Sequence, residues 1–411
     1  MVQAPAASFE RSVATNTSIW LDVIRGIAAQ VVLFSHTFQI FFSGDSLVTP
    51  TYSVLMAVAL FAKQAVVSFF VISGWLVGGK LLRDLFVQKF ELRKYIIDRT
   101  TRLWVVLIPA LVLTMMCDQV AIRFGAGMTI IANRSPFYPE WWYQVFPWSL
   151  KTFLSNLFFL QMIASWQFGS NLSLWSLSNE FWYYLLFPCI LGIFLSHRTK
   201  TRLICLIAAI GVIGLFFVSD RTPLYISYFL IWSAAGIAAQ IPRKLATFVI
   251  VVAALSVPAI FTVTAGIKMP LTSDLFTATV ALLFLLWSDK IPIRKLCRPA
   301  KFLSSYSYSV YAIHLPVLLV LMSFDPALFV RVDLSAETLI RFMIYMTFIN
   351  LVALGFSRLT EEKTDWVRGI INTGWANFKT NAIQMRRWTL AYHLKLPRSF
   401  KQEKWLKGDA T

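Results

Sequence analysis

Apolar stretches of about 20 residues recur along most of this 411-residue chain. A helix needs about 20 residues to cross the roughly 30 Å of hydrocarbon in a bilayer, so these stretches predict membrane-spanning helices. A transmembrane β-barrel would instead show alternating strands of about ten residues, which this sequence lacks. The composition agrees, because 57% of the residues are hydrophobic and only 14% are charged, against about 25% charged residues in a soluble domain. We therefore predict an all-α polytopic membrane protein.

Ten apolar ranges are long enough to be predicted as spans, and one further stretch is ambiguous. The ambiguous stretch, residues 150–163, is a short span or a re-entrant or interfacial segment, because 14 residues are too few for an ordinary crossing. The ten predicted spans cover residues 20–42, 55–79, 103–122, 172–195, 203–218, 224–240, 246–265, 274–288, 303–323 and 339–357.

The distribution of Lys and Arg decides how the ambiguous stretch is counted. With ten spans and cytoplasmic N- and C-termini, 29 of the 38 basic residues fall in inner segments and 6 in outer ones. An eleventh span would move the last four inner clusters outside. Since basic residues collect in cytoplasmic loops, we predict ten spans. The net charge of +18 has the same origin, and the dispersed basic residues do not indicate nucleic-acid binding.

Three parts follow from this topology: residues 1–19 as a cytoplasmic segment, 20–357 as the transmembrane domain, and 358–411 as a cytoplasmic tail. The longest outer loop, residues 123–171, is rich in aromatic side chains. These fit an interfacial belt or stacking against sugar faces. The tail has 11 basic and 5 acidic residues with interspersed Trp and Phe. It is predicted to be an amphipathic segment on anionic membrane lipid. The four cysteines are far apart, so neither a disulfide framework nor a metal site is predicted.

The first predicted span carries Asp22, Arg25 and His36. Eleven residues make almost three helical turns, so Arg25 and His36 share a face and lie about 16 Å apart. Ionisable residues inside a span are costly and usually face a bundle interior or a wet cavity. One interpretation is that this face lines a polar site. The alternative is that Asp22 and Arg25 neutralise each other while His36 bonds a buried carbonyl.

Two further groups of interest lie in the second predicted span and at the cytoplasmic entrance of the third. Phe69, Ser73 and Gly74 form an F-x-x-x-S-G run, which also fits plain helix packing. Arg99 and Arg102 share a helix face at i, i+3. They lie in a basic cluster that suits a phosphate-bearing cytoplasmic ligand, although the positive-inside rule alone predicts such a cluster too.

Two ionisable residues in the fourth and ninth spans complete the candidate set. Glu180 lies at a predicted depth comparable with that of His36, and a carboxylate beside an imidazole indicates acid and base chemistry. His314 shares a face with Ser307 and Tyr311, and it either bonds a neighbouring helix or lines the same cavity.

Taken in order, these motifs make residues 18–362 resemble the acyltransferase 3 family of integral-membrane acyltransferases. Arg25 and His36 are similar to its R-x10-H signature, and Arg99 and Arg102 to its R-x-x-R motif. The other matching segments are the F-x-x-x-S-G run, Trp175 to Glu180 followed by Tyr184, and Ser305 to Pro316. The chain departs from the family at Leu103 to Val105, where Tyr-Pro is common, and after Glu361, where a proline is common.

The resemblance implies an O-acyltransferase of the inner (cytoplasmic) membrane. Such an enzyme moves an acyl group, usually acetyl, from cytoplasmic acetyl-CoA to a hydroxyl of an extracytoplasmic or lipid-linked carbohydrate, such as an exopolysaccharide or O-antigen. On this hypothesis Arg25, Arg99 and Arg102 bind the CoA phosphates, and no metal takes part. His36 acts as general base, with Glu180 as its partner. Asp22, Ser73, Tyr184 and His314 are the supporting site residues.

Two other classes of function remain open from the sequence. Ten spans and a cavity also fit a transporter or flippase for a lipid-linked glycan or an anionic solute, in which the buried Arg, Glu and His bind and pass the substrate. A structural partner in a polysaccharide-secretion complex would explain the basic tail but not the buried ionisable residues. The spacing from Arg25 to His36, with a basic cytoplasmic cluster, favours the enzyme.

Overall fold

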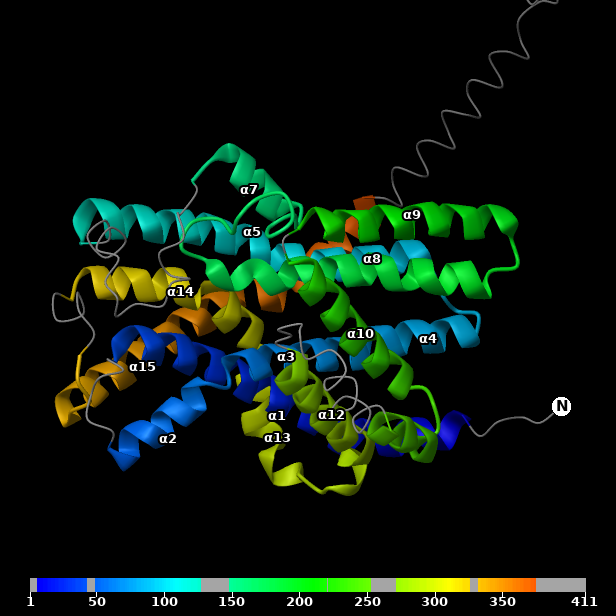
Figure 1. Cartoon of the computed structure of the whole chain (residues 1–411), viewed down its shortest axis with the longest axis horizontal. Helices are drawn as coiled ribbons and strands as arrows, with labels where there is room; N and C mark the ends of the chain where they lie inside the picture. The colour runs from blue at the N-terminus through cyan, green and yellow to red at the C-terminus, as the bar shows by residue number, and fades with distance from the viewer. Residues whose placement is uncertain are drawn as a thin grey trace, which may run out of the picture. The chain divides into compact units, whose positions relative to one another are not determined.

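The computed structural model describes residues 6–42, 49–126, 148–219, 221–252, 271–325 and 332–374. Every regular element in these residues is a helix (Figure 1). Residues 1–363 form one compact unit, and residues 364–411 form a second, of which residues 364–374 are described and helical. The fold class predicted from the sequence, an all-α protein, is confirmed for the described residues.

Polar residues set where several helices begin. Thr49 caps α2, because its hydroxyl accepts a bond from the backbone N–H of Tyr52. Ser335 and Thr338 form a capping box at the start of α15. The principal helices are α1 (Ala6–Phe41), α2 (Pro50–Ala59), α3 (Ala62–Ser73), α4 (Gly79–Phe86), α5 (Leu92–Phe124), α7 (Leu150–Leu157), α8 (Trp175–Leu195), α9 (Thr199–Val218), α10 (Thr222–Ala238), α12 (Leu271–Trp287), α13 (Cys297–Ser305), α14 (Ser307–Ser323) and α15 (Ala336–Leu359).

Six helical segments in the described residues are long and apolar enough to cross a membrane. They are Asn16–Phe41, Pro50–Phe86, Leu92–Phe124, Leu172–Leu195, Thr199–Val218 and the helix that begins at Ala336. The pair α13 and α14, bent by 47°, makes a seventh if it counts as one span. Helices occupy the other predicted ranges as well, except that residues 253–265 lie outside the described part. The count of ten and the cytoplasmic termini stay predictions.

The ambiguous stretch at residues 150–163 is not a continuous helix. Its helix, α7, has eight residues and a length of about 12 Å, too short to cross a bilayer. The chain then turns at Phe159 and Met162, both with positive φ. Ser178 Oγ and Trp182 Nε1 of α8 each donate a hydrogen bond to the carbonyl of Phe159. These bonds hold the turn against α8.

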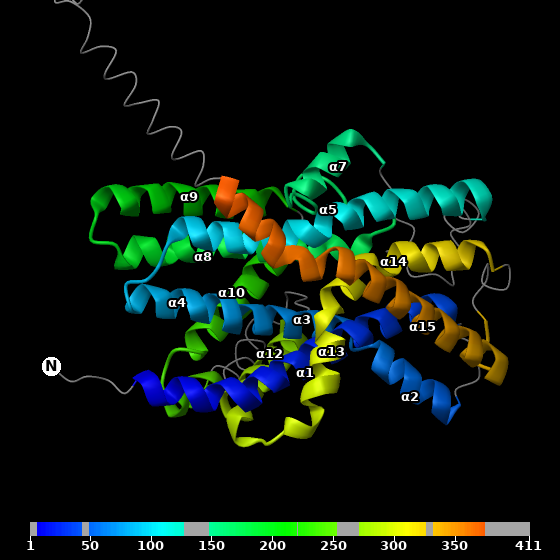
Figure 2. The same ribbon diagram turned by 180° about the vertical axis from the view of Figure 1, so that it is seen from behind.

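The helices of the first unit are arranged around α3 and α10. Both views show α5, α8 and α9 along one side, α1, α12 and α13 along the opposite side, and α3 and α10 between them (Figures 1 and 2). α1 packs against α3, α13 and α14, while α14 also packs against α5 and α15.

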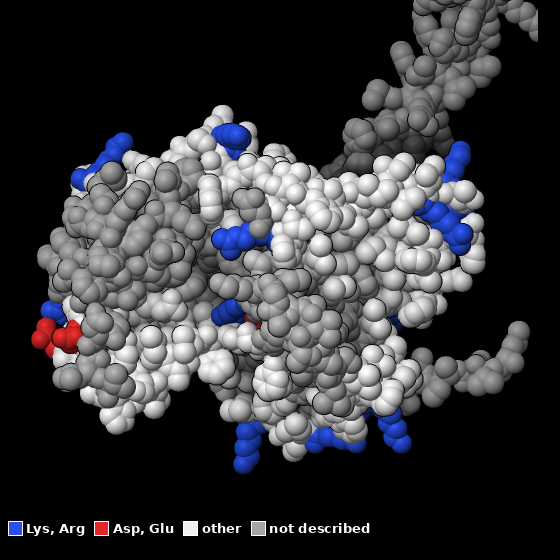
Figure 3. All heavy atoms as spheres, in the orientation of Figure 1, with Lys and Arg blue, Asp and Glu red and all other residues white. Residues whose placement is uncertain are grey.

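Parts of the outer surface of the described helices are apolar. Figure 3 shows wide areas of one face without a charged side chain, between basic groups in the middle of the face and at its edges. α9 exposes a run of large hydrophobic side chains: Leu203, Ile204, Ile207, Ile210 and Phe217. A lipid-facing surface accounts for this exposure, which water would penalise.

Glycine permits the closest helix contact, which joins the end of α3 to α10. Residues Gly74–Gly78 form one π-helical turn. A Cβ atom on Gly74 would lie 2.0 Å from the carbonyl oxygen of Trp232, and one on Gly236 would lie 3.0 Å from Cα of Gly78. The backbones of the two helices therefore touch without intervening side chains, as small residues allow in membrane proteins.

This contact predicts the effect of one methyl group. Gly74→Ala should lower the free energy of unfolding by about 1–3 kcal/mol, because the new Cβ overlaps a backbone oxygen that cannot rotate away. The measurement is thermal unfolding of the purified protein in detergent. Gly211→Ala on α9 is the matched control, since a Cβ there meets no atom within 4 Å. Equal stability of both variants would contradict the close-contact explanation.

Candidate active site

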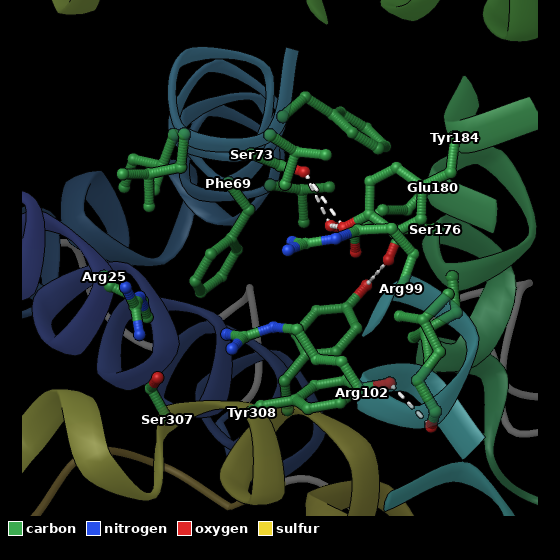
Figure 4. A pocket seen from close by; sticks show the side chains of 18 residues that line it. Arg25, Phe69, Ser73, Arg99, Arg102, Ser176, Glu180, Tyr184, Ser307 and Tyr308 are labelled. Atoms are coloured by element: carbon green, nitrogen blue, oxygen red, sulfur yellow. Dashed lines mark hydrogen bonds between the residues drawn. The ribbon is translucent and has the colours of Figure 1, made fainter. Parts of the chain in front are cut away.

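One cavity, here called the arginine cavity, lies between α1, α3, α5, α8 and α14 and has a volume of about 180 Å³. Figure 4 shows its side chains, with Arg25 entering from α1 and Glu180 from α8. The polar lining residues are Arg25, Ser73, Arg99, Arg102, Ser176, Glu180, Tyr184, Ser307, Tyr308 and Tyr311. The arrangement brings residues from five helices to one space.

Three guanidinium groups dominate the charge of this cavity. Arg99 and Arg102 lie three residues apart on α5 and both line it. No carboxylate in the described part of the chain forms an ion pair with either of them, and Arg99 Nε is buried without a hydrogen-bond partner. Arg25 Nη2 lies 3.9 Å from Asp22 Oδ1. Because guanidinium groups only donate hydrogen bonds, the cavity offers unfilled donors to an anion.

Glu180 is held on the wall of the arginine cavity by two hydroxyl groups. Ser73 Oγ donates to Glu180 Oε1 at 2.6 Å, and the Tyr184 hydroxyl donates to the same oxygen. Ser73 Oγ in turn accepts a bond of 3.0 Å from Trp232 Nε1. The indole of Trp232 thus donates to Ser73, and Ser73 donates to Glu180. This order is required because a carboxylate can only accept hydrogen bonds.

A second carboxylate, that of Glu361 near the end of the first unit, interacts with Arg102 and Arg25. Glu361 Oε2 accepts bonds from the backbone N–H and the hydroxyl of Ser309, at 3.3 and 3.1 Å. Its charge interacts with those of Arg102 and Arg25. Glu361 therefore joins the first turn of α14 to the electrostatics of the arginine cavity.

His36 and His314 form a hydrogen-bonded pair. His36 Nδ1 lies 2.8 Å from His314 Nε2, and the rings stack with centroids 5.1 Å apart. His314 Nδ1 lies 3.0 Å from the carbonyl oxygen of Val310 and 2.9 Å from that of Tyr311. A carbonyl only accepts, so His314 carries its proton on Nδ1 and presents Nε2 as an acceptor. His36 must then donate from Nδ1, which leaves its Nε2 as the basic nitrogen.

His36 lines a second cavity, here called the His36 cavity, with a volume of about 300 Å³. Its walls come from α1, α3, α8, α10, α14 and the segment before α8. The polar and aromatic residues that line it with His36 are Lys63, Gln167, Ser173, Trp175, Asn179, Arg221, Tyr225 and Tyr228. It shares no lining residue with the arginine cavity among the described residues.

One layer of side chains separates the two cavities. Phe70 lines the arginine cavity and stacks on Tyr228 of the His36 cavity, with ring centroids 5.0 Å apart. Tyr311 lines the arginine cavity, and its ring centroid lies 6.2 Å from that of His314. At the start of α8, Trp175 and Ser176 are adjacent in sequence but line different cavities. The two spaces therefore meet back to back.

The structure brings six predicted residues together around the arginine cavity: Arg25, Ser73, Arg99, Arg102, Glu180 and Tyr184. It pairs His36 with His314 instead of with Glu180. The predicted partnership of His36 with Glu180 is corrected here, because the two side chains line different cavities and Glu180 is bonded to Ser73 and Tyr184. Asp22 accepts a bond of 2.9 Å from Ser304 Oγ and thereby joins α1 to α13.

Several residues in or beside the two cavities were missed from the sequence. Lys63 forms an ion pair of 2.8 Å with the fully buried Asp274, and both belong to predicted spans. The rule that singled out Arg25, a charge inside a span, would have found them as well. Tyr308, Trp232 and Gln167 gave no comparable signal, because aromatic and amide side chains are common in such helices. Of the aromatic loop residues, Trp148 bonds buried Asp118, and residues 127–147 lie outside the described part.

Comparisons with known proteins identify the family of the chain. A search of curated proteins and a search of solved structures gave no match. A family model described as an acyltransferase domain matches residues 18–358. The match runs from α1 to α15 and covers the helices that form both cavities. The chain therefore belongs to the acyltransferase 3 family of membrane acyltransferases.

Proposed function

We propose that this protein transfers an acyl group, in the first place acetyl, from cytoplasmic acyl-CoA to a hydroxyl of an extracytoplasmic or lipid-linked carbohydrate. The observation that carries the proposal is the pair of cavities back to back, one lined by three guanidinium groups and the other by His36. On the topology predicted from the basic residues, the arginine cavity lies toward the cytoplasm and the His36 cavity toward the outside of the inner membrane.

The arginine cavity is the proposed donor site. Arg99 and Arg102, which have no ion pair in the described residues, bind the phosphates of CoA, with Arg25 beside them. The acyl end of the donor extends past Phe69 and Tyr311 toward His36. Glu180 belongs to this cavity, where its charge offsets part of the positive charge of the guanidinium groups. The donor is a substrate, and the reaction needs no metal.

His36 is the proposed general base. The hydroxyl oxygen of the acceptor attacks the thioester carbonyl carbon while its proton passes to His36 Nε2. The carbon–sulfur bond then breaks, and the imidazolium returns the proton to the departing thiolate, which leaves an ester and free CoA. His314 is a positioning residue, because its bond to His36 Nδ1 keeps the other nitrogen basic.

The test of the function uses purified protein in detergent with labelled acetyl-CoA and an extract of envelope polysaccharide. Acyl transfer should release free CoA thiol and place label on carbohydrate. A transporter or flippase would bind solute without releasing thiol, so intact acetyl-CoA after prolonged incubation would contradict the proposal.

The donor site predicts a difference between two cations. Arg99→Lys and Arg102→Lys should each raise the Kd for CoA by about tenfold, because an ammonium group cannot reproduce the bidentate guanidinium fork. Calorimetric titration with CoA measures the effect. Arg83→Lys, at the end of α4 and outside the arginine cavity, is the matched control. If both test variants bind CoA as tightly as the parent protein, these arginines only set the orientation of the protein in the membrane.

The histidine pair predicts a graded series of transfer rates. His36→Ala should reduce transfer by roughly 10²–10⁴-fold, the usual contribution of a general base. His314→Met should cost about tenfold or more, because it removes the acceptor that fixes the His36 tautomer.

His314→Gln should restore much of that loss, since its side-chain oxygen can accept the bond from His36 while its size stays similar. Melting temperatures measured on the same samples separate positioning from folding. If the Met and Gln variants are equally active and equally stable, His314 does not position His36.

A further inference from the structure

We infer that the His36 cavity is the acceptor site and that it takes a single sugar residue that carries or adjoins an anionic group, a phosphate or a carboxylate. This inference rests on the proposed function, because it names the place and the charge of the acceptor. The volume of about 300 Å³ is at the small end of the range for ligand sites, which suits one sugar residue.

Two atoms of buried amide groups in the cavity wall lack hydrogen-bond partners among the described residues. They are Gln167 Oε1 and Asn179 Nδ2, on residues that are 5% and 1% exposed. A buried polar atom without a partner costs free energy, so such atoms usually indicate a ligand or water. One of these atoms accepts and the other donates, and a sugar hydroxyl does both.

Aromatic side chains supply the apolar part of the wall. Trp175 and Tyr228 line the cavity with ring centroids 6.0 Å apart. Tyr225 is held in place by bonds of its hydroxyl with Ser178 Oγ and the carbonyl of Gln161. Rings beside amide groups form the usual surface for a sugar, whose C–H faces pack on the rings while its hydroxyls bond the amides.

Apart from His36, the ionisable groups among the described lining residues with an acidic or basic charge are two cations, Lys63 and Arg221. Lys63 Nζ lies 2.8 Å from Asp274 Oδ2, which also accepts a bond of 3.1 Å from Tyr228. Asp274 is fully buried and does not line the cavity, while the Lys63 side chain is 38% exposed. Arg221 follows α9 and has no ion pair in the described residues. Asp274 offsets the charge of Lys63, so Arg221 supplies the uncompensated positive charge. That charge, with no carboxylate among the described lining residues, favours an anionic acceptor.

The experiment uses the full-length protein in detergent with ¹⁴C-labelled acetyl-CoA. The acceptor is the total polysaccharide and glycolipid fraction of the cells that make the protein, and the product is separated on an anion exchanger. Label should be retained as anionic material. Gln167→Met and Arg221→Gln should each raise the amount of extract needed for half-maximal labelling by about tenfold, with unchanged affinity for CoA.

The controls separate the acceptor site from folding and from the donor site. Arg198→Gln is matched to Arg221→Gln, because Arg198 precedes α9 where Arg221 follows it, and it lines neither cavity. Lys63 is left intact, since its loss would leave the buried charge of Asp274 unpaired and destabilise the fold.

Three outcomes would overturn the inference. If both variants are saturated by the same amount of extract as the parent protein, the His36 cavity is not the acceptor site. Label that emerges only in neutral material would refute the anionic acceptor while leaving acyl transfer intact. Wild-type protein that binds CoA but labels nothing would contradict the proposed function itself, and the inference would fall with it.

Discussion

The backbone contact between residues Gly74–Gly78 and α10 is the constraint on which both cavities depend. It brings Trp232 to Ser73, and Ser73 then directs its proton to Glu180 in the arginine cavity. The same approach stacks Phe70 of α3 on Tyr228 of α10, which separates that cavity from the His36 cavity. A side chain at position 74 would push the two helices apart. It would disturb both the hydrogen bonds from Trp232 through Ser73 to Glu180 and the stacked rings that separate the cavities. Gly74 therefore serves the site through packing, whereas Ser73 beside it bonds Glu180 directly.

The energetic cost of charges inside the bundle explains why they occur in groups. In the described residues, Asp274 Oδ2 is bonded by Lys63 and Tyr228, and Glu180 Oε1 by two hydroxyl groups. Arg99 Nε, by contrast, has no hydrogen-bond partner there. An unpaired guanidinium in an enclosed space is costly unless water or an anion satisfies it. The unsatisfied guanidinium donor of Arg99 thus lies in the cavity where the proposed donor would carry its phosphates.

The sequence predicted the helices and much of the arginine cavity, but it misplaced the partner of His36. Arg99 and Arg102 could be put on one face because residues three apart on a helix are neighbours whatever the tertiary fold. Glu180 was assigned to His36 because the two had similar predicted depths in the membrane. Depth fixes a position along the helix axis only, whereas the rotation of each helix and its neighbours decide which cavity a side chain faces. The pairs Lys63 with Asp274 and His36 with His314 depend on the same unknown rotations, so no spacing in one sequence could give them.

The layer of rings between the cavities bears on how a thioester could react with the acceptor without being hydrolysed by water. Transfer requires the acyl carbon and the acceptor oxygen to meet near His36, while water must be kept from the same carbon. Phe69, Phe70 and Tyr311 form the wall of the arginine cavity toward the histidine pair, and the Tyr311 hydroxyl lies 2.7 Å from that of Ser176. A wall one side chain thick lets an extended acyl arm reach the base by small ring movements, yet it fills the space that a continuous water channel would need. The aromatic character of this layer therefore follows from the chemistry proposed for the two cavities, because a polar layer would solvate the thioester it is meant to protect.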